Sequence, residues 1–323
     1  METKKFNEIT RIPLAPLNTP VEPLERLTAS IKGAPNLFIK RDDFIGPLVW
    51  GNKLRKLEYS FGAAKEAGAD VVITCGAVQS NHARTTSMVA RRLGIESLLV
   101  LNGVEPETAR ANYLISKMMA SKILIVPDKD DRQPAMEEAA KEYRGSGRNP
   151  FIIPLGASDM YGTPGFVRAM IELRQQQESA GIRFSHIVVS SSSGGTQGGM
   201  EAGKRIAVMQ DIDIIGISAD ESCSGLCKNV VRAANPILQM TGFDTINDSD
   251  LFVDDRFTGS EYGKPTAESE KAAELFLTHE GILLDHTYTA KAAAGMLKLI
   301  EEGRFSERDN VLFWHTGGLL NLF

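Results

Sequence analysis

The sequence predicts an α/β protein of two lobes, each with a mainly parallel twisted sheet flanked by helices. From Leu37 onward, short β-rich apolar runs alternate with longer segments of helical period. This alternation is typical of βαβ units around parallel sheets. The chain has 323 residues, more than one compact core usually holds, so we expect two lobes with a cleft between them.

A first series of strands and helices is expected before Gly162. Its strands are Val71–Cys75, Ser97–Leu101, Ile123–Val126 and Phe151–Pro154. The segments between them read as helices, at Asn81–Leu93, Thr108–Met119 and Ala135–Tyr143, and a further helix, Lys53–Ala67, precedes them. Each intervening helix is long enough to be a crossover connection, so the strands are expected to form one small parallel sheet.

A second series follows Gly162 and predicts a second sheet. It begins with a long helix to about Ala180 and continues with strand His186–Ser190, helix Thr196–Val208 and strand Ile212–Ile217. Asn310–Trp314 reads as a further strand near the end of the chain.

Composition narrows the class of ligand. Hydrophobic residues make up 42% of the chain and charged residues 24%, with a net charge of -5. No long basic run occurs, so nucleic acid and anionic membranes are poor candidates and a small molecule is expected. The N-terminus lacks the apolar core of a secretory signal, and no apolar stretch reaches the roughly 18 residues needed to span a bilayer. We therefore expect a cytoplasmic protein.

No metal site is expected. The histidines lack zinc-ligand spacing, and Cys223 and Cys227 have no second ligand pair nearby. Three cysteines in a long chain argue against a disulfide framework and fit a reducing compartment.

A turn rich in glycine and serine follows strand His186–Ser190 and opens the next helix. Backbone N–H groups at a helix N-terminus favour an anion, and glycines such as Gly194 and Gly195 let the backbone approach it closely. Ser193 and Thr196 add hydroxyl donors, so a phosphate fits this turn. The turn lacks a Walker A lysine and G-x-G-x-x-G spacing, which disfavours ATP and NAD. A polar turn without a ligand is the alternative.

Another polar turn, Gln79-Ser80-Asn81-His82, follows strand Val71–Cys75 and precedes a helix. Its N–H groups could receive a carboxylate. Two anion sites on two lobes suit a cofactor phosphate and a substrate carboxylate. A simple N-cap by Ser80 or Asn81 explains this turn equally well.

Lys53 lies at the start of a helical segment, after a Gly-Asn turn. The positive potential at a helix N-terminus favours the neutral, nucleophilic amine and thus imine formation. The alternative is a solvated helix face shared with Arg55 and Lys56.

Three further side chains occupy turns where ligands are often bound. Thr316 follows the strand Asn310–Trp314, at the edge where α/β sheets bind ligands, and its hydroxyl could donate to a ring nitrogen. Tyr262 and Tyr288 lie in turns before helices. By spacing alone, a turn for Thr316 and packing for the tyrosines are the simpler explanations.

Taken together, several motifs resemble those of the D-cysteine desulfhydrase and 1-aminocyclopropane-1-carboxylate deaminase family. They are Lys40-Arg41-Asp42-Asp43, Gly51-Asn52-Lys53-Leu54-Arg55-Lys56-Leu57-Glu58, Gln79-Ser80-Asn81-His82, Gly194-Gly195-Thr196, Tyr262-Gly263, Gly281-Ile282-Leu283-Leu284-Asp285 and His315-Thr316-Gly317-Gly318. The family has the tryptophan synthase β-like fold, fold type II among pyridoxal-phosphate enzymes, usually as a homodimer. The resemblance implies pyridoxal 5'-phosphate as cofactor. It also implies a large cofactor-binding domain of residues 1–56 with 163–323 and a small domain of residues 57–162.

The resemblance also implies roles for the residues noted above. Lys53 matches the Schiff-base lysine, Asn81 the partner of the ring hydroxyl, and Thr316 the residue facing the pyridine nitrogen. The phosphate cradle is matched by Ser193, Gly194, Gly195 and Thr196. Tyr288 would lie against the cofactor ring and Tyr262 would face the substrate. Gln79, Ser80 and Asn81 would meet the substrate, and Lys53, Ser80, Tyr262 and Tyr288 would carry the catalysis.

Within the family, His82, Thr289 and Thr316 match the desulfhydrase-like branch, whereas the deaminase branch typically has Gln, Glu and Leu. The resemblance thus implies a carbon–sulfur lyase that eliminates the β substituent of a small, D-cysteine-like amino acid, giving pyruvate, ammonia and sulfide. Trp50 and His286 depart from the family, which commonly has Gly and Pro there, and leave an L-cysteate sulfo-lyase open. A deaminase, an amino-acid racemase and a non-catalytic cofactor-binding protein also stay open.

Overall fold

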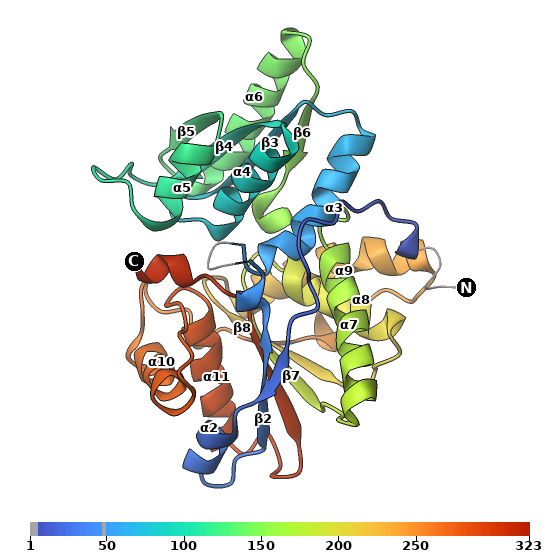
Figure 1. The fold of residues 1–323 in the computed structure, drawn as a ribbon, viewed down its shortest axis with the longest axis vertical. Coiled ribbons are helices and arrows are strands. Elements are labelled where there is room, and N and C mark those ends of the chain that lie inside the picture. Colours follow the sequence, from blue (N-terminus) through green and yellow to red (C-terminus); the bar gives the residue numbers. More distant parts are fainter. Residues whose placement is uncertain (1–5, 47–49) are drawn as a thin grey trace.

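The computed structural model describes residues 6–46 and 50–323 and contains two sheets, one above the other in Figure 1. Residues 1–5, part of the N-terminal segment considered above, lie outside the described ranges. Helix α3 (Lys53–Glu66) passes between the sheets. The two-lobed α/β architecture expected from the sequence is confirmed. The expected domain boundary between residues 56 and 57 falls inside α3 and stays a prediction.

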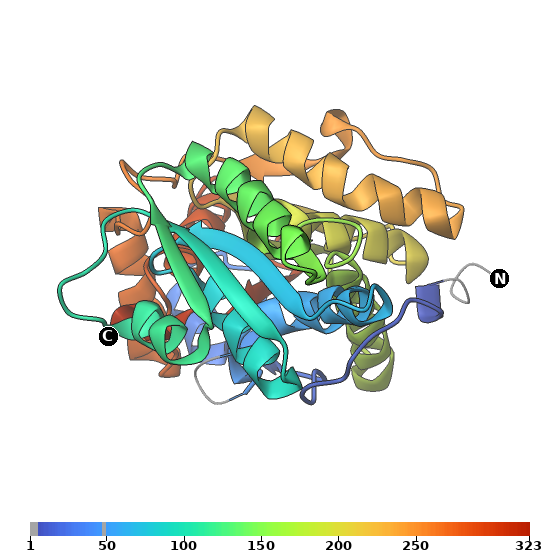
Figure 2. The same cartoon turned by 90° about the horizontal axis from the view of Figure 1, so that it is seen from above.

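The small sheet has four parallel strands in the order β5-β4-β3-β6. They are β3 (Val71–Ala77), β4 (Glu96–Asn102), β5 (Lys122–Val126) and β6 (Pro150–Ile153). Helices α4 (Asn81–Leu93) and α5 (Ala111–Met119) pack on one face, and α6 (Arg132–Gly145) packs on the other (Figures 1 and 2). The first predicted series is therefore confirmed, with small shifts at the ends of the helices.

The shift at α5 has a tertiary cause. This helix was expected from Thr108 but begins at Ala111. The amide oxygen of Gln79 accepts from the N–H of Tyr113 at 3.1 Å, and its nitrogen donates to the carbonyl of Arg110 at 3.4 Å. A side chain from the end of β3 thus caps α5, and no local sequence signal carries that contact.

The large sheet has the order β1-β2-β10-β7-β8-β9, with only β1 antiparallel to its neighbour among the described strands. Its strands are β1 (Val21–Pro23), β2 (Asn36–Arg41), β7 (His186–Ser191), β8 (Asp213–Ser218), β9 (Phe252–Asp254) and β10 (Asn310–His315). Helices α7 (Pro164–Ala180) and α8 (Gly195–Ile206) cover one face, with α9 (Cys223–Thr241) packed outside α8. Helices α2 (Glu25–Ser30), α10 (Ala267–Glu280) and α11 (Thr289–Glu301) cover the other.

Short 3-10 helices connect several of these elements. They are η1 (Asp42–Phe44), η2 (Lys129–Asp131), η3 (Leu155–Ala157), η4 (Asp248–Asp250) and η5 (Leu319–Leu322). Within the described ranges, no helix is both long enough and apolar enough to cross a membrane.

Helix α8 packs unusually close to its neighbour α7. A Cβ on Gly199 would lie 2.5 Å from the Cβ of Phe166, and a Cβ on Gly203 would lie 2.7 Å from the Cβ of Met170. Contacts that short do not occur, so α7 would have to shift if either glycine gained a side chain. The first turn of α8 is therefore fixed firmly relative to the large sheet.

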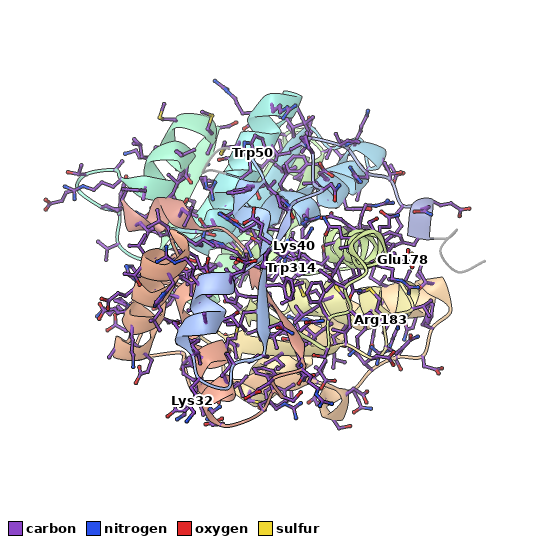
Figure 3. The ribbon with its side chains drawn as sticks, turned by 60° about the horizontal axis from the view of Figure 1, so that its bottom comes forward. Lys32, Lys40, Trp50, Glu178, Arg183 and Trp314 are labelled. Atoms are coloured by element: carbon purple, nitrogen blue, oxygen red, sulfur yellow. The ribbon has the colours of Figure 1, made fainter. Side chains whose placement is uncertain are left out.

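A buried ionic network joins α3 to the large sheet. Arg55 donates to both carboxylate oxygens of Asp42, at 2.8 and 2.7 Å, and to Glu172 at 2.8 Å. The indole N–H of Trp314 on β10 also donates to Asp42 at 2.8 Å. Lys40 pairs with Glu172 and lies beside Trp314 (Figure 3). Burial alone would raise the pKa of Asp42, but Arg55, together with Lys40 and Trp314, more than offsets it and holds this pKa below its usual value.

Replacing Arg55 by Met should destabilise the protein strongly. The change leaves Asp42 buried without its main counter-charge, which typically costs about 3–5 kcal/mol. Chemical unfolding of the two proteins measures the loss. Arg91→Met, on an exposed position of α4, is the matched control and should change stability by at most ~0.5 kcal/mol. Equal effects of the two substitutions would contradict this role of the network.

Candidate active site

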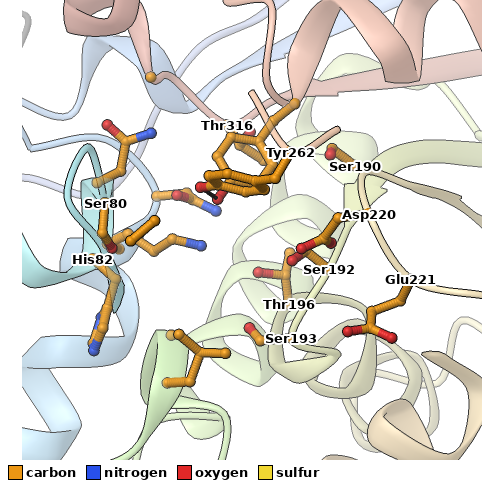
Figure 4. Close-up of a pocket in the computed structure, with 18 of the residues that line it drawn as sticks. Ser80, His82, Ser190, Ser192, Ser193, Thr196, Asp220, Glu221, Tyr262 and Thr316 are labelled. Carbon is orange, nitrogen blue, oxygen red and sulfur yellow. Dashed lines mark hydrogen bonds between the residues drawn. The ribbon is translucent and has the colours of Figure 1, made fainter. Parts of the chain in front are cut away.

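A cavity of about 400 Å³ lies at the carboxyl ends of strands from both sheets. Its walls come from the segments after β3, β7, β8 and β10 and from the start of α3. Figure 4 shows Ser80 and His82 on one side of it and Ser192, Ser193 and Thr196 on the other. Parallel sheets place ligands at this edge of their strands. The cavity is therefore the natural place to look for the predicted site.

Lys53 is the first residue of α3 and lines the cavity. The turn before it packs on the end of β10: the N–H of Asn52 donates to the carbonyl of Thr316 at 3.2 Å. A Cβ on Gly51, whose φ is +59°, would lie 3.1 Å from that same carbonyl. The Lys53 Nζ lies 5.9 Å from the centre of the Tyr288 ring. Two of the predicted site residues, Lys53 and Thr316, thus meet because a backbone turn joins their elements.

The Lys53 amine is easier to deprotonate than an ordinary lysine. Burial lowers its pKa to about 8, although Asp285 and Asp220 pull in the opposite direction. No hydrogen bond from Nζ to any described residue limits its freedom. An amine of this kind is suited to imine formation and to proton abstraction.

The turn at the start of α8 forms a compact cradle. Gly194 caps the helix with a φ of +82°, and Ser193, Gly194 and Thr196 line the cavity. Gly195 lies just behind them, where a Cβ would come within 2.5 Å of the Ser158 hydroxyl. The N–H groups of a first helical turn have no partner inside the helix, so they are free to bind an anion.

A buried lysine lies behind this cradle. Lys56 is fully buried and donates to the Ser158 hydroxyl at 3.2 Å, and Ser158 is hydrogen-bonded to Ser193 at 2.8 Å. Burial, followed by repulsion from Lys53, holds the pKa of Lys56 well below its usual value. A phosphate in the cradle would supply the missing negative charge. The donors and glycines present therefore fit the phosphate of pyridoxal 5'-phosphate.

The start of α4 forms the opposite wall. Ser80 caps this helix, since its hydroxyl oxygen accepts from the N–H of Ala83 at 3.2 Å, and it also lines the cavity. Ser80 can therefore serve both as the N-cap of α4 and as a ligand-binding residue. The amide oxygen of Asn81 accepts from Arg84 and Asn112, at 3.0 and 2.9 Å. Its NH₂ group is consequently left to face the cavity, where it can donate to a ring oxygen.

Tyr262 and Tyr288 lie together over the cavity. Their hydroxyls are hydrogen-bonded to each other, and their rings meet edge to face with centres 6.0 Å apart. Burial raises the pKa of Tyr262 to about 12 and that of Tyr288 well above its usual value. Both hydroxyls therefore keep their protons at neutral pH. One of the two hydroxyl protons forms the hydrogen bond between the tyrosines, and the other is available to donate to a ligand.

Other predicted residues lie elsewhere. The Gln79 side chain caps α5 and is not among the cavity-lining groups, so this arrangement brings no contact from it to a substrate. Thr289 donates to the buried carboxylate of Asp285. Of the two departures from the family pattern, Trp50 lines the cavity, whereas His286 does not.

His82 lines the cavity as a neutral imidazole. Burial, then Lys53 and Lys56, lower its pKa well below the usual value. The His82 Nε2 lies 2.8 Å from the Thr74 hydroxyl, which also donates to the carbonyl of Ile153 at 2.7 Å. The Nδ1 atom of His82 is buried.

Sequence reasoning missed several groups that belong to this site. Lys56 and Arg84 each lie three residues after a predicted site residue, Lys53 and Asn81, and so share its helix face. This three-residue spacing could have indicated that Lys56 and Arg84 lie near the site. Ser158 reaches the cradle from η3, and Asp220 lines the cavity after β8 (Figure 4). Neither carries a motif that could have revealed it.

Replacing Lys56 by Met should weaken binding of pyridoxal phosphate by about tenfold or more, because a charge behind the cradle is lost. Titration of the cofactor-free protein, followed by visible absorbance, gives the affinity. Pyridoxal without the phosphate is the control ligand and should bind both proteins alike. Equal weakening for pyridoxal would show that Lys56 does not act on the phosphate.

Comparisons with known proteins agree with this geometry. Residues 12–317 match the family described as pyridoxal-phosphate dependent enzyme. A Pyrococcus furiosus protein provisionally named 1-aminocyclopropane-1-carboxylate deaminase is 37% identical, covering 98% of this chain and 94% of its own. The D-cysteine desulfhydrase of Klebsiella pneumoniae is 34% identical, covering 100% and 98%. A crystal structure of an ACC deaminase homologue, 36% identical, superposes with a TM-score of 0.88 and covers 100% and 96%.

More distant structures share the fold alone. A pyridoxal 5'-phosphate-dependent aspartate racemase is 16% identical, with a TM-score of 0.67 over 98% of this chain and 94% of its own. The family match and the relatives above 30% identity confirm the cofactor and the fold expected from the motifs. The chain belongs to the pyridoxal-phosphate-dependent enzymes, within the family that includes 1-aminocyclopropane-1-carboxylate deaminases and D-cysteine desulfhydrases.

Proposed function

We propose that this enzyme is a carbon–sulfur lyase that converts a D-cysteine-like amino acid and water to pyruvate, ammonia and hydrogen sulfide. The observation that carries the proposal is the position of Lys53. Its amine, with a pKa of about 8, lies in one cavity with an anion cradle on α8 and a second anion-binding turn on α4.

The cavity residues fit this reaction. Ser193, Gly194 and Thr196 would hold the cofactor phosphate, and the NH₂ group of Asn81 would donate to the ring hydroxyl. The Thr316 hydroxyl is buried and forms no hydrogen bond with a described residue, so it would be free to meet the pyridine nitrogen. Tyr288 would lie against the ring. When bound, pyridoxal phosphate stabilises the electron pair left behind as the α-proton departs.

Substrate handling falls to the groups around Lys53. The Ser80 hydroxyl and the first N–H groups of α4 bind the substrate carboxylate. The Lys53 amine, once displaced by the substrate amine, removes the α-proton. Tyr262 faces the β substituent, and the available tyrosine proton assists its departure as sulfide. With the neutral hydroxyl of Thr316 at the pyridine nitrogen, the ring would be less electron-withdrawing than with a carboxylate there, which suits elimination of a good leaving group.

Product analysis tests the choice of reaction. Purified enzyme is offered D-cysteine, L-cysteine, L-cysteate and 1-aminocyclopropane-1-carboxylate. We expect pyruvate and sulfide from a cysteine. Pyruvate with sulfite would instead identify a cysteate lyase, to which the bulky Trp50 at the cavity wall points. Formation of 2-oxobutyrate would identify a deaminase, as in the relatives of that name, and a changed enantiomer would identify a racemase.

The attachment site of the cofactor has its own test. Borohydride reduction of the yellow enzyme should fix the label on Lys53, read by peptide mass spectrometry. Lys53→Ala should abolish the label, whereas Lys65→Ala, an exposed position on the same helix, should retain it. A label on Lys56 would refute the assignment of Lys53 while leaving the family intact.

Covalent uptake of pyridoxal phosphate by cofactor-free enzyme should rise with pH, reach half its maximum near pH 8 and level off about one unit higher. With a pKa of about 8, roughly a tenth of the Lys53 amine is neutral at pH 7, far more than for an ordinary lysine. Stopped-flow absorbance gives the initial rate at each pH. A rate that keeps climbing to pH ~10.4, the range of an ordinary lysine, would contradict the depressed value.

We also propose that residues 57–162 form a small domain beside a cofactor-binding domain of residues 1–56 with 163–323, and that the enzyme acts as a homodimer on a small amino acid. Light scattering on the holoenzyme measures the oligomeric state.

A further inference from the structure

Arg84 is a buried cation without a counter-charge. Its side chain is 2% exposed and lines the cavity. Within residues 6–46 and 50–323, no carboxylate pairs with it. Its Nη2 donates to the amide oxygen of Asn81 at 3.0 Å, while its Nε and Nη1 atoms are buried without any partner in those ranges. Burial lowers the pKa of Arg84 to about 9, so it is still charged at neutral pH.

An isolated buried charge is costly, so its retention beside an active site calls for a function. One possibility is that a substrate anion binds Arg84 directly. The two unpartnered nitrogens are fully enclosed, however, and give a ligand no access. The remaining route from the guanidinium to a ligand runs through Asn81.

The contacts of Asn81 fix which way its amide points. Arg84 and the NH₂ group of Asn112 both donate to one atom of that amide, at 3.0 and 2.9 Å. Because both neighbours are donors, this atom must be the oxygen. The NH₂ group of Asn81 therefore faces the cavity, toward the turn at Gly318, whose added Cβ would lie 3.3 Å from it. A cation on the amide oxygen also makes the NH₂ group a stronger donor.

We propose that Arg84 is a positioning residue that acts through Asn81 to hold the ring hydroxyl of bound pyridoxal phosphate in its ionised form. This inference rests on the proposed placement of that hydroxyl at Asn81. The positive charge favours the ionised oxygen, and so disfavours the proton that the oxygen shares with the Lys53 nitrogen in the bound cofactor. Removing the charge should therefore raise the pKa of that shared proton.

Spectroscopic titration of the holoenzyme tests the proposal. The visible absorbance of the bound cofactor is followed across pH for the native enzyme, Arg84→Met and Arg84→Lys. We expect the pKa to rise by about one unit or more in Arg84→Met, as for the loss of one poorly screened nearby charge. Arg84→Lys keeps the charge and should stay much closer to the native value. An unchanged pKa in Arg84→Met would overturn the proposal.

Stability of the cofactor-free protein separates this role from a merely structural one. Without a counter-charge, Arg84 contributes no ion pair to the fold, so Arg84→Met should unfold at the same or a higher denaturant concentration than the native protein. A marked loss of stability, or failure to fold, would overturn the proposal because it would show Arg84 to be a structural residue.

The variant Asn81→Ala distinguishes failure of this inference from failure of the site assignment. If Asn81→Ala raises the pKa of the bound cofactor and Arg84→Met does not, only the role of Arg84 is refuted. If neither changes it, the placement of the ring hydroxyl at Asn81 is wrong, and the inference falls with it. Borohydride labelling of Lys53 in each variant shows independently that the cofactor is still attached there.

Discussion

The ion pair between Arg55 and Asp42 is the contact on which the arrangement of the active site depends. Both partners are fully buried, and each also binds a second element: Arg55 reaches Glu172 on α7, and Asp42 accepts from Trp314 on β10. Arg55 is two residues after Lys53, and Trp314 is two residues before Thr316. The network therefore fixes the start of α3 against the end of β10, from the side away from the cavity. The Lys53 amine and the Thr316 hydroxyl line the same cavity because this network prevents α3 from shifting along β10.

The cavity wall itself holds more positive charge than its acids neutralise nearby. Arg84 behind Asn81 has no carboxylate partner among the described residues. Lys56 behind the cradle has only the influence of Asp159, and Lys53 only that of Asp285 and Asp220. Unpaired buried cations weaken a fold, so the protein alone is not at its most stable. A ligand that brings a phosphate and an acidic ring oxygen supplies the missing charges. Binding of the cofactor should therefore also stabilise the fold, because the same positively charged side chains take part in both.

Most of the sheet framework could be predicted because its strands are buried on both faces. Strands β3 and β7 contain unbroken apolar stretches, Val71–Ile73 and Ile187–Val189, and polar turns follow both strands, a pattern typical of buried parallel strands. The alternation predicted from Leu37 gave no bounds for the strand Asn36–Arg41, in which Lys40 is buried beside Glu172. The helix Cys223–Thr241 was also missed, and it contains Pro236. Local pattern thus finds elements whose burial is purely apolar and misses those that depend on a distant partner.

The residues of the candidate site also fall into two groups, those with a local sequence signal and those placed by contacts between distant segments. Lys53 and the turns at Ser80 and Ser193 carry local signals, because a helix start after a strand is readable in sequence. The contact from Asn112 to Asn81 and the contribution of Ser158 arise only when distant segments meet. The resemblance implied a substrate contact for Gln79, and that contact stays a prediction, since the Gln79 amide is hydrogen-bonded to the start of α5.

The close packing of α8 has an evolutionary consequence. Gly199 and Gly203 leave no space between this helix and α7, so the cradle at its first turn can change neither position nor tilt without rebuilding both helices. A change in the shape of the cavity is therefore accommodated more readily on the opposite wall, in the segments after β3 and around Trp50. The enzyme can exchange one substrate for another from that side while the phosphate of its cofactor stays where it is.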